Sequence, residues 1–176
     1  MIAWVAMPAI ADPYDSTVLL RHKDWSVKHV FDTSDGMQWC TAETAGRNGT
    51  SMSVTAYDNG AIAFSLFNPR WRMPENAERH VTVDLDYERF GGWATTYGQA
   101  LSLELDGEVG LNFLTHLSMG NAAAIYNEDM RRITTFSLRG SRAAVAKLGE
   151  CFGLIRLPDE RDPFIGTGAS GSDPFL

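Results

Sequence analysis

The chain has 176 residues, of which 15 are Lys or Arg and 22 are Asp or Glu, so its formal net charge is −7 at pH 7. Apolar residues make up 44% and charged residues 21%, a globular composition that excludes a collagen, a coiled coil, a disulfide knot and a wholly disordered chain. The length predicts one domain. The acidic balance argues against nucleic-acid binding, which needs a surplus of Lys and Arg.

The first eleven residues are apolar and uncharged, and they end in Ala9-Ile10-Ala11. Because signal peptidases accept such small residues, we interpret residues 1–11 as the remnant of a signal peptide. An N-terminal strand or a short docking arm is the alternative, since no Lys or Arg precedes Arg21. No stretch reaches the roughly 18–20 apolar residues of a membrane span. We therefore expect a protein of the periplasm or the secreted fraction that does not span the membrane.

Alternation of apolar and polar residues predicts a series of antiparallel strands. The clearest pair is 51–57 with 61–67, joined by the tight turn Asp58-Asn59-Gly60. In the first of these strands Ser51, Ser53, Thr55 and Tyr57 share the face opposite the apolar residues. Gly91-Gly92 is expected to break the chain between two strands. The other expected strands are 25–31, 37–42, 80–87, 93–97, 100–105, 122–126 and 132–138.

Two helices follow the strands. The first is expected to begin at Asp106 or Gly107 and to end at Gly120, and the second to run from Arg142 to Phe152. Their apolar residues recur at helical spacing, as in helices that pack on a sheet. The residues expected on the packed faces are Val109, Leu111, Phe113, Leu114 and Leu117 in the first helix, and Ala144, Val145, Leu148 and Cys151 in the second.

These elements predict an α+β protein: an antiparallel β-meander bent into a sandwich or a partly open barrel, with two helices at its side or end. The single β-rich domain is expected to span residues 12–157. Residues 158–176 contain little apolar material and several Pro and Gly residues, which predicts a flexible tail.

Cys40 and Cys151 are the only cysteines, and their spacing fits no zinc or redox motif. In an exported protein such a pair indicates one disulfide. It would close a loop of about 110 residues, which the chain-entropy argument values at roughly 4–5 kcal/mol. Two free buried thiols in a cytosolic protein are the alternative.

The segment Arg70-Trp71-Arg72 concentrates positive charge and a large aromatic ring on an acidic chain. Because Trp and Arg are enriched in binding hot spots, it is a candidate partner-binding loop, although Trp71 could instead cover one end of the core. The tripeptide Asp-Pro-Phe occurs twice in the tail and ends in Phe164 and Phe175. We interpret these two residues as candidate docking elements, with chance repetition as the alternative.

The sequence contains no nucleophile elbow, P-loop or dinucleotide fingerprint. Asp84, Asp86 and Glu88 could share a strand face, but alternating acidic residues are usually the solvated side of a strand. His116 is interpreted as an ordinary helix residue. We therefore expect no catalytic residues, no metal and no cofactor.

The motifs Asp24-Trp25-Ser-Val, Trp39-Cys40, Asn68-Pro69 and Thr135 to Ala144, with the hairpin Ser51 to Phe67, occur in the order found in one known group. Over residues 24–152 the chain resembles the invasion-associated locus B family of exported proteobacterial proteins. Members of that family usually carry more cysteines. The resemblance implies an exported β-rich domain without an established catalytic site.

Together these observations predict a non-catalytic interaction protein of the cell envelope, an accessory subunit or binding module with a protein partner. An inhibitor of an exported hydrolase is the second hypothesis, because a rigid disulfide-locked domain could present a loop to a cleft. An enzyme without a recognisable motif is the third.

Overall fold

The computed structural model describes residues 13–86 and 88–156. It confirms the α+β class, with antiparallel strands in one sheet and two helices. The expected signal-peptide remnant and tail lie outside the described residues. The strands are β1 (Tyr14–His22), β2 (Trp25–Asp32), β3 (Gln38–Ala45), β4 (Ser51–Tyr57), β5 (Ile62–Phe67), β6 (Glu78–Leu85), β7 (Glu88–Tyr97), β8 (Ala100–Leu105), β9 (Ala122–Tyr126) and β10 (Arg132–Ser137). The helices are α1 (Gly107–Met119) and α2 (Ser141–Ile155), so α2 extends beyond the expected end at Phe152.

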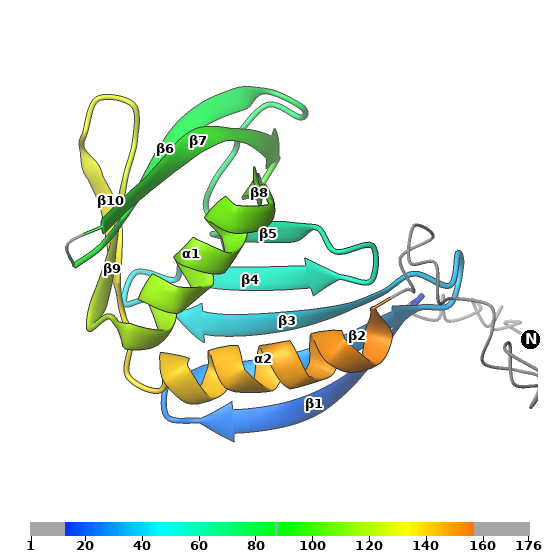
Figure 1. Cartoon of the computed structure of the whole chain (residues 1–176). Helices are drawn as coiled ribbons and strands as arrows, with labels where there is room; N and C mark the ends of the chain where they lie inside the picture. The colour runs from blue at the N-terminus through cyan, green and yellow to red at the C-terminus, as the bar shows by residue number, and fades with distance from the viewer. Residues whose placement is uncertain (1–12, 87, 157–176) are drawn as a thin grey trace, which may run out of the picture.

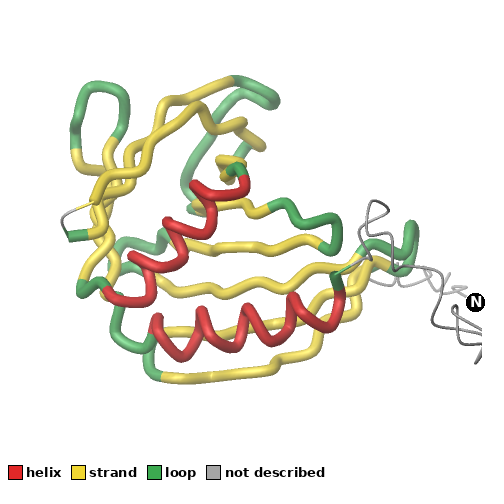
Figure 2. The backbone as a smooth tube through the Cα atoms, viewed as in Figure 1, coloured by secondary structure: helices red, strands yellow, loops and turns green. Residues whose placement is uncertain are grey.

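The sheet is one curled layer that is not closed into a barrel (Figure 1). Its order is β1-β2-β3-β4-β5-β8-β7-β6-β9-β10. Consecutive strands therefore pair from β1 to β5, after which β8 takes the place beside β5 and β6 lies farther out. Both helices lie on the same face, which curls around them (Figures 1 and 2). The opposite face, which we call the helix-free face, is the convex exterior of the sheet.

The core lies between the sheet and the helices. In the expected hairpin, Val54 and Phe64 are completely buried, as their alternation predicts. On α1 the buried positions are Gly110, Phe113 and Leu117, which recur at helical spacing on one side. A Cβ atom at Gly110 would lie 3.0 Å from Cδ1 of Ile62, so glycine allows this helix to approach β5 closely.

The expectation that Val109 and Leu111 pack on the sheet is wrong. Their side chains are 51% and 63% exposed. One helix touching one sheet buries only a stripe about two residues wide per turn. The positions taken by Gly110 and Phe113 define that stripe, so Val109 and Leu111 lie beside it.

Strand β7 passes through Gly91-Gly92 without a break, so the expected interruption there is wrong. The strand pairs with β6 from Glu88 to Thr95, but it pairs with β8 only from Thr95 to Tyr97. A Cβ atom at Gly92 would lie 2.7 Å from Cδ1 of Leu103. The glycine therefore leaves room for the Leu103 side chain at the place where β7 departs from β8 and the sheet bends.

Cys40 and Cys151 form the expected disulfide, with their Cα atoms 6.1 Å apart. Both residues are buried, at 0% and 3% exposure. The bond joins α2 to β3. Ala144 and Leu148 are buried on the same side of α2 as Cys151. No described helix is long and apolar enough to cross a membrane.

Strand β1 was not predicted. It forms one edge of the sheet and pairs with β2, with a bulge between Val18 and Leu20. Eight of its nine residues are exposed, so the strand has no buried face to produce the alternation of apolar and polar residues. The bulge distorts the free edge, which discourages pairing with another chain.

Candidate functional site

The helix-free face is the largest surface of the sheet that no described element covers. Side chains alternate between the two faces along each strand, so every second residue of a strand points to the helix-free face. In β4 the residues opposite Met52 and Val54 point to this face, and in β8 the residues opposite Leu101 and Leu103 do so. The two sets become neighbours because β5 lies between β4 and β8.

Small side chains occupy the centre of this face. Ser53, Ser65 and Ser102 lie directly across from one another on β4, β5 and β8, and Thr55 and Ala63 form the adjacent pair. We call these five residues the serine floor. Although no described element covers this face, Thr55 and Ala63 are only 8% and 7% exposed. The floor is therefore recessed between taller neighbours.

The hydroxyl groups of the floor are partly paired. Ser65 Oγ donates to Ser102 Oγ at 2.9 Å, and Thr55 Oγ1 donates to Thr41 Oγ1 at 3.1 Å. A hydroxyl has one donor and two acceptor positions. The floor consequently retains hydrogen-bonding capacity toward solvent.

Four aromatic residues of the same face stand around the floor. We call them the aromatic rim: Trp39, Tyr57, Phe67 and Tyr97. Trp39 and Tyr57 are cross-strand partners on β3 and β4, with ring centroids 6.2 Å apart. Phe67 and Tyr97 flank Ala100 on either side in the register of β5, β8 and β7. On the other side of Trp39 the ring of Tyr14 packs edge-on at 5.7 Å.

Tyr57, Tyr97 and Glu104 all belong to the helix-free face. Burial raises the pKa of Tyr57 above its ordinary value, and the negative charges of Tyr97 and Glu104 raise it further. Tyr57 is half-buried, whereas Tyr97 and Glu104 are exposed. The raised pKa keeps Tyr57 a phenol that can donate a hydrogen bond.

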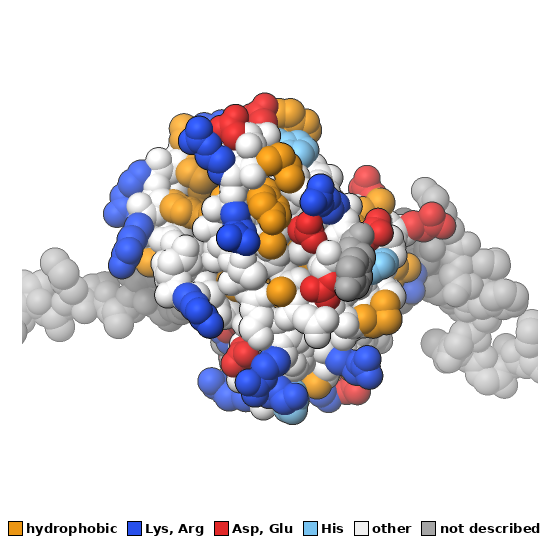
Figure 3. Space-filling model, turned by 90° about the vertical axis from the view of Figure 1, so that its left-hand side faces the viewer, with side chains coloured by type: hydrophobic (Ala, Val, Ile, Leu, Met, Phe, Trp, Pro, Cys, Tyr) orange, Lys and Arg blue, Asp and Glu red, His pale blue; other side chains and the backbone are white. Residues whose placement is uncertain are grey.

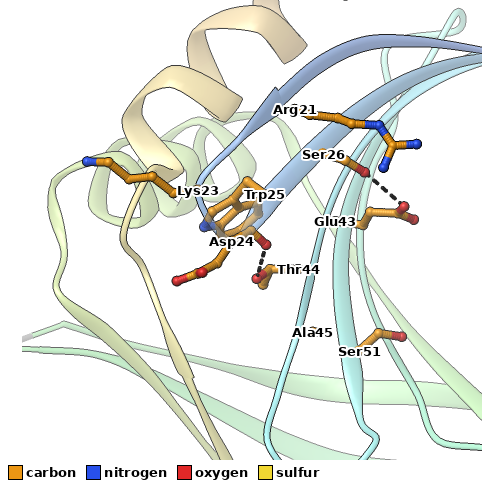
Figure 4. Close-up of a pocket in the computed structure, with 9 residues that line it drawn as sticks. All are labelled: Arg21, Lys23, Asp24, Trp25, Ser26, Glu43, Thr44, Ala45 and Ser51. Atoms are coloured by element: carbon orange, nitrogen blue, oxygen red, sulfur yellow. Dashed lines mark hydrogen bonds between the residues drawn. The ribbon is translucent and has the colours of Figure 1, made fainter.

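A hollow of about 520 Å³ lies beside the turn between β1 and β2, and its lining includes Ser26 and Glu43 of the helix-free face as well as Trp25 of the inner face (Figure 4). Figure 4 shows Arg21, Ser26 and Glu43 on the same side, with Lys23 pointing away from them. Glu43 is already engaged, because it accepts a hydrogen bond from Ser26 Oγ at 2.9 Å and pairs with Lys28. The charged residues Arg21, Lys23 and Asp24 also line the hollow.

Trp25 forms part of the wall of this hollow. Its side chain is 2% exposed, and its Nε1 is the only buried side-chain nitrogen or oxygen without a hydrogen-bond partner among the described residues. The indole belongs to the inner face of β2, where it packs in the core. A buried donor without a partner costs free energy, so this N–H is a polar group that the described residues leave unsatisfied.

The structure separates the sequence-predicted loop residues from this face. Trp71 is half-buried and packs against the core, as the alternative interpretation expected, whereas Arg70 and Arg72 are exposed. Nη1 of Arg72 donates to the carbonyl oxygens of Pro69 at 2.9 Å and of Trp71 at 2.6 Å. Partner binding by this loop stays a prediction. Phe164 and Phe175 lie outside the described residues.

The acidic residues considered for a cation site have other partners. Asp84 pairs with Nε of Arg89 at 2.9 Å, and Asp86 accepts hydrogen bonds from the backbone N–H groups of Asn121 and Ala122. Within residues 13–86 and 88–156 no group of three His, Cys, Asp or Glu side chains is placed to hold a metal ion. His116 lies on α1, with its ring beside Phe90.

The end of the molecule formed by β6, β7, β9 and β10 carries a mixture of acidic, basic and apolar side chains (Figure 3). Exposed residues of the β9–β10 turn include Met130 and Arg131. Because opposite charges are interspersed here, this end lacks the single sign of charge that steers a charged ligand.

Comparisons with protein-family models, with curated proteins and with solved structures found no match to this chain. The sequence indicated only the parts of the site: alternation placed Tyr57 opposite the apolar residues of β4, and Ser102 and Glu104 on the outward side of β8. No local signal shows that β8 lies beside β5, and so the alignment of Ser102 with Ser65 and of Glu104 with Ala63 could not be found from the sequence.

Proposed function

We propose that this protein is a non-catalytic binding module that works in an oxidising compartment, either the periplasm or the outside of the cell, and that contacts its partner through the helix-free face. The observation that carries the proposal is the recessed serine floor with its aromatic rim. Tyr and Trp are enriched where proteins bind other molecules, because each combines a large apolar ring with a polar tip.

The disulfide supports the assignment of compartment. Cysteine pairs persist as disulfides mainly in secreted and periplasmic proteins, since the cytosol keeps thiols reduced. Cys40 and Cys151 are both buried, which fits a structural bond better than a reactive one. The resemblance of residues 24–152 to an exported family points the same way.

The arrangement of the floor favours binding over catalysis. A serine nucleophile needs a general base within hydrogen-bond reach. Ser65 and Ser102 instead bond to each other, and the negative charge of Glu104 raises the pKa of the Tyr57 phenol rather than activating it. The site therefore offers positions for contacts and no assembled proton relay.

Site-specific photo-crosslinking in the native host tests this proposal. A benzoylphenylalanine placed at Ser102 is expected to form a defined adduct, because this position lies in the middle of the helix-free face. The matched control places the same residue at Thr115, which is exposed on α1. Adducts of equal yield at both positions, or no adduct at Ser102, would contradict the use of this face.

A further inference from the structure

We infer that the hollow beside the β1–β2 turn binds the carboxyl-terminal end of a short peptide, whose terminal carboxylate pairs with Arg21 and whose preceding amide group pairs with Trp25 and Asp24. The hollow measures about 520 Å³, within the range of roughly 300–1,000 Å³ found for sites that hold small ligands. None of the serine-floor residues lines it. The inference therefore goes beyond the proposed function and does not depend on it.

The buried N–H group of Trp25 requires an acceptor. Trp25 lines the hollow, yet its side chain is only 2% exposed and its Nε1 has no hydrogen-bond partner among the described residues. An indole nitrogen can only donate, and a buried donor without a partner costs free energy. In Figure 4 this nitrogen lies on the side of the ring that faces the turn residues Lys23 and Asp24. A ligand that places a carbonyl oxygen there recovers the cost.

The unpaired charges of the hollow favour an anionic end group. Within the part of the chain that the structure describes, the side chains of Arg21, Lys23 and Asp24 form no hydrogen bond or ion pair. Glu43, by contrast, is paired with Lys28. Two cations therefore stand against one free carboxylate, on a chain whose net charge is −7. Because a guanidinium binds a carboxylate through two parallel hydrogen bonds, Arg21 is the group that receives the terminal carboxylate.

The side of the hollow next to Asp24 favours a neutral amide. There the N–H of Trp25 donates and the carboxylate of Asp24 accepts, and a peptide group offers the matching carbonyl oxygen and N–H. A second carboxylate at this place would be repelled by Asp24. In Figure 4 Arg21 and Asp24 extend on opposite sides of the Trp25 ring. An extended peptide end therefore presents its last amide group to one side and its terminal carboxylate to the other.

The backbone of the β1–β2 turn is held in place, whereas its side chains are free. Lys23 has a φ of 54° in the two-residue turn between His22 and Trp25. A Cβ atom at Gly140 would lie 2.9 Å from the carbonyl oxygen of His22 and 3.2 Å from Cβ of Lys23, so the start of α2 packs closely against the turn. Because Nε1 of Trp25 is closed off from solvent, the exposed side chains of Lys23 and Asp24 shift when the ligand reaches it.

Binding of trialanine, triserine and trileucine to the full chain tests the inference. Proton–nitrogen NMR spectroscopy follows the indole N–H signals of the five Trp residues, which are assigned through the backbone resonances. At least one peptide is expected to bind and to shift the Trp25 signal. Amidation of its carboxyl terminus and the Arg21→Ala substitution are each expected to raise the dissociation constant at least about tenfold. Arg131→Ala is the matched control, since Arg131 is exposed in the β9–β10 turn and does not line the hollow.

Three outcomes would overturn the inference: none of the three peptides binds, the amidated peptide binds as tightly as the free acid, or the Trp25 signal stays unchanged at saturation. Equal losses of affinity in Arg21→Ala and Arg131→Ala would also overturn it. Crosslinking at Ser102 tests the proposed function separately. An adduct at Ser102 without peptide binding leaves the proposed function and removes this ligand. Peptide binding without an adduct leaves this site and removes the helix-free face as the partner surface.

Discussion

The ring of Phe113 on α1 lies edge-on against the ring of Phe90 on β7, with centroids 5.2 Å apart and planes at 83°. The same Phe113 ring meets Phe64 of β5 at 5.6 Å. Because β7 departs from β8 at Thr95, these contacts connect the two parts of the curled sheet from inside. Helix α1 thus holds the curvature that shapes the helix-free face.

Replacing Phe113 by Ala should therefore be strongly destabilising. The side chain is completely buried, and large-to-small changes of this kind cost about 3–5 kcal/mol. Urea denaturation followed by circular dichroism measures the loss. Leu111→Ala is the control on the same helix, since Leu111 is 63% exposed and should change stability by no more than about 0.5 kcal/mol. Equal losses in the two variants would refute the role given to Phe113.

Reduction of the disulfide should destabilise the fold by up to about 4–5 kcal/mol, because the bond closes a loop between residues 111 apart in the sequence. The double variant Cys40→Ser/Cys151→Ser should lose a similar amount. Denaturation midpoints with and without dithiothreitol measure the effect. The double variant should not respond to dithiothreitol, and a response would show that the reagent acts elsewhere.

Gly92→Ala should destabilise the protein, whereas Gly91→Ala should be nearly neutral. A Cβ atom at Gly92 would meet Leu103 Cδ1 at 2.7 Å, while the nearest atoms at Gly91 lie at 3.4 Å. Overpacking of this kind costs about 1–3 kcal/mol. Thermal melting of both variants measures the difference. If the clash with Leu103 is the cause, Gly92→Ala should cost less stability in a Leu103→Ala background than in the native chain, and a double-mutant cycle measures this difference. An equal cost in both backgrounds would show that the clash is not the cause.

Tyr57 should contribute to alkaline unfolding. Its folded-state pKa is raised, so its contribution to stability is fully present below the unfolded value near 10 and is lost as the pH rises through the folded value. Tyr57→Phe should therefore lose less stability than the native chain between about pH 8 and about pH 11. Urea midpoints at the two pH values measure this difference.

Glu104→Gln provides a second test of the same cluster. Removing the negative charge should shift the titration of Tyr57 to lower pH, since Glu104 helps to raise its pKa. The difference in ultraviolet absorbance between each protein and its Tyr57→Phe counterpart isolates this titration. An unchanged titration would show that Glu104 and Tyr57 do not interact.

The local elements were predictable because each has a complete short-range pattern. The hairpin of β4 and β5 combines clean alternation with an Asn-Gly turn, and the disulfide followed from the presence of two cysteines. Strand β1 lacked such a pattern, since an exposed edge strand buries neither face. The predicted burial of Val109 and Leu111 was wrong because apolar residues do not by themselves show how wide the buried stripe of a helix is.

The sequence by itself determined most of the strands that bury one face, which side of those strands is apolar, and that Cys40 has Cys151 as its only possible partner within the chain. These properties depend on neighbours in the chain and on the chemistry of single residues. Only the tertiary structure decided that β8 lies beside β5 and that Gly92 marks a bend rather than an end. That order places Glu104 of β8 in line with Ala63 and Thr55. It could not be predicted locally, because strand order depends on packing between distant segments that no local pattern encodes.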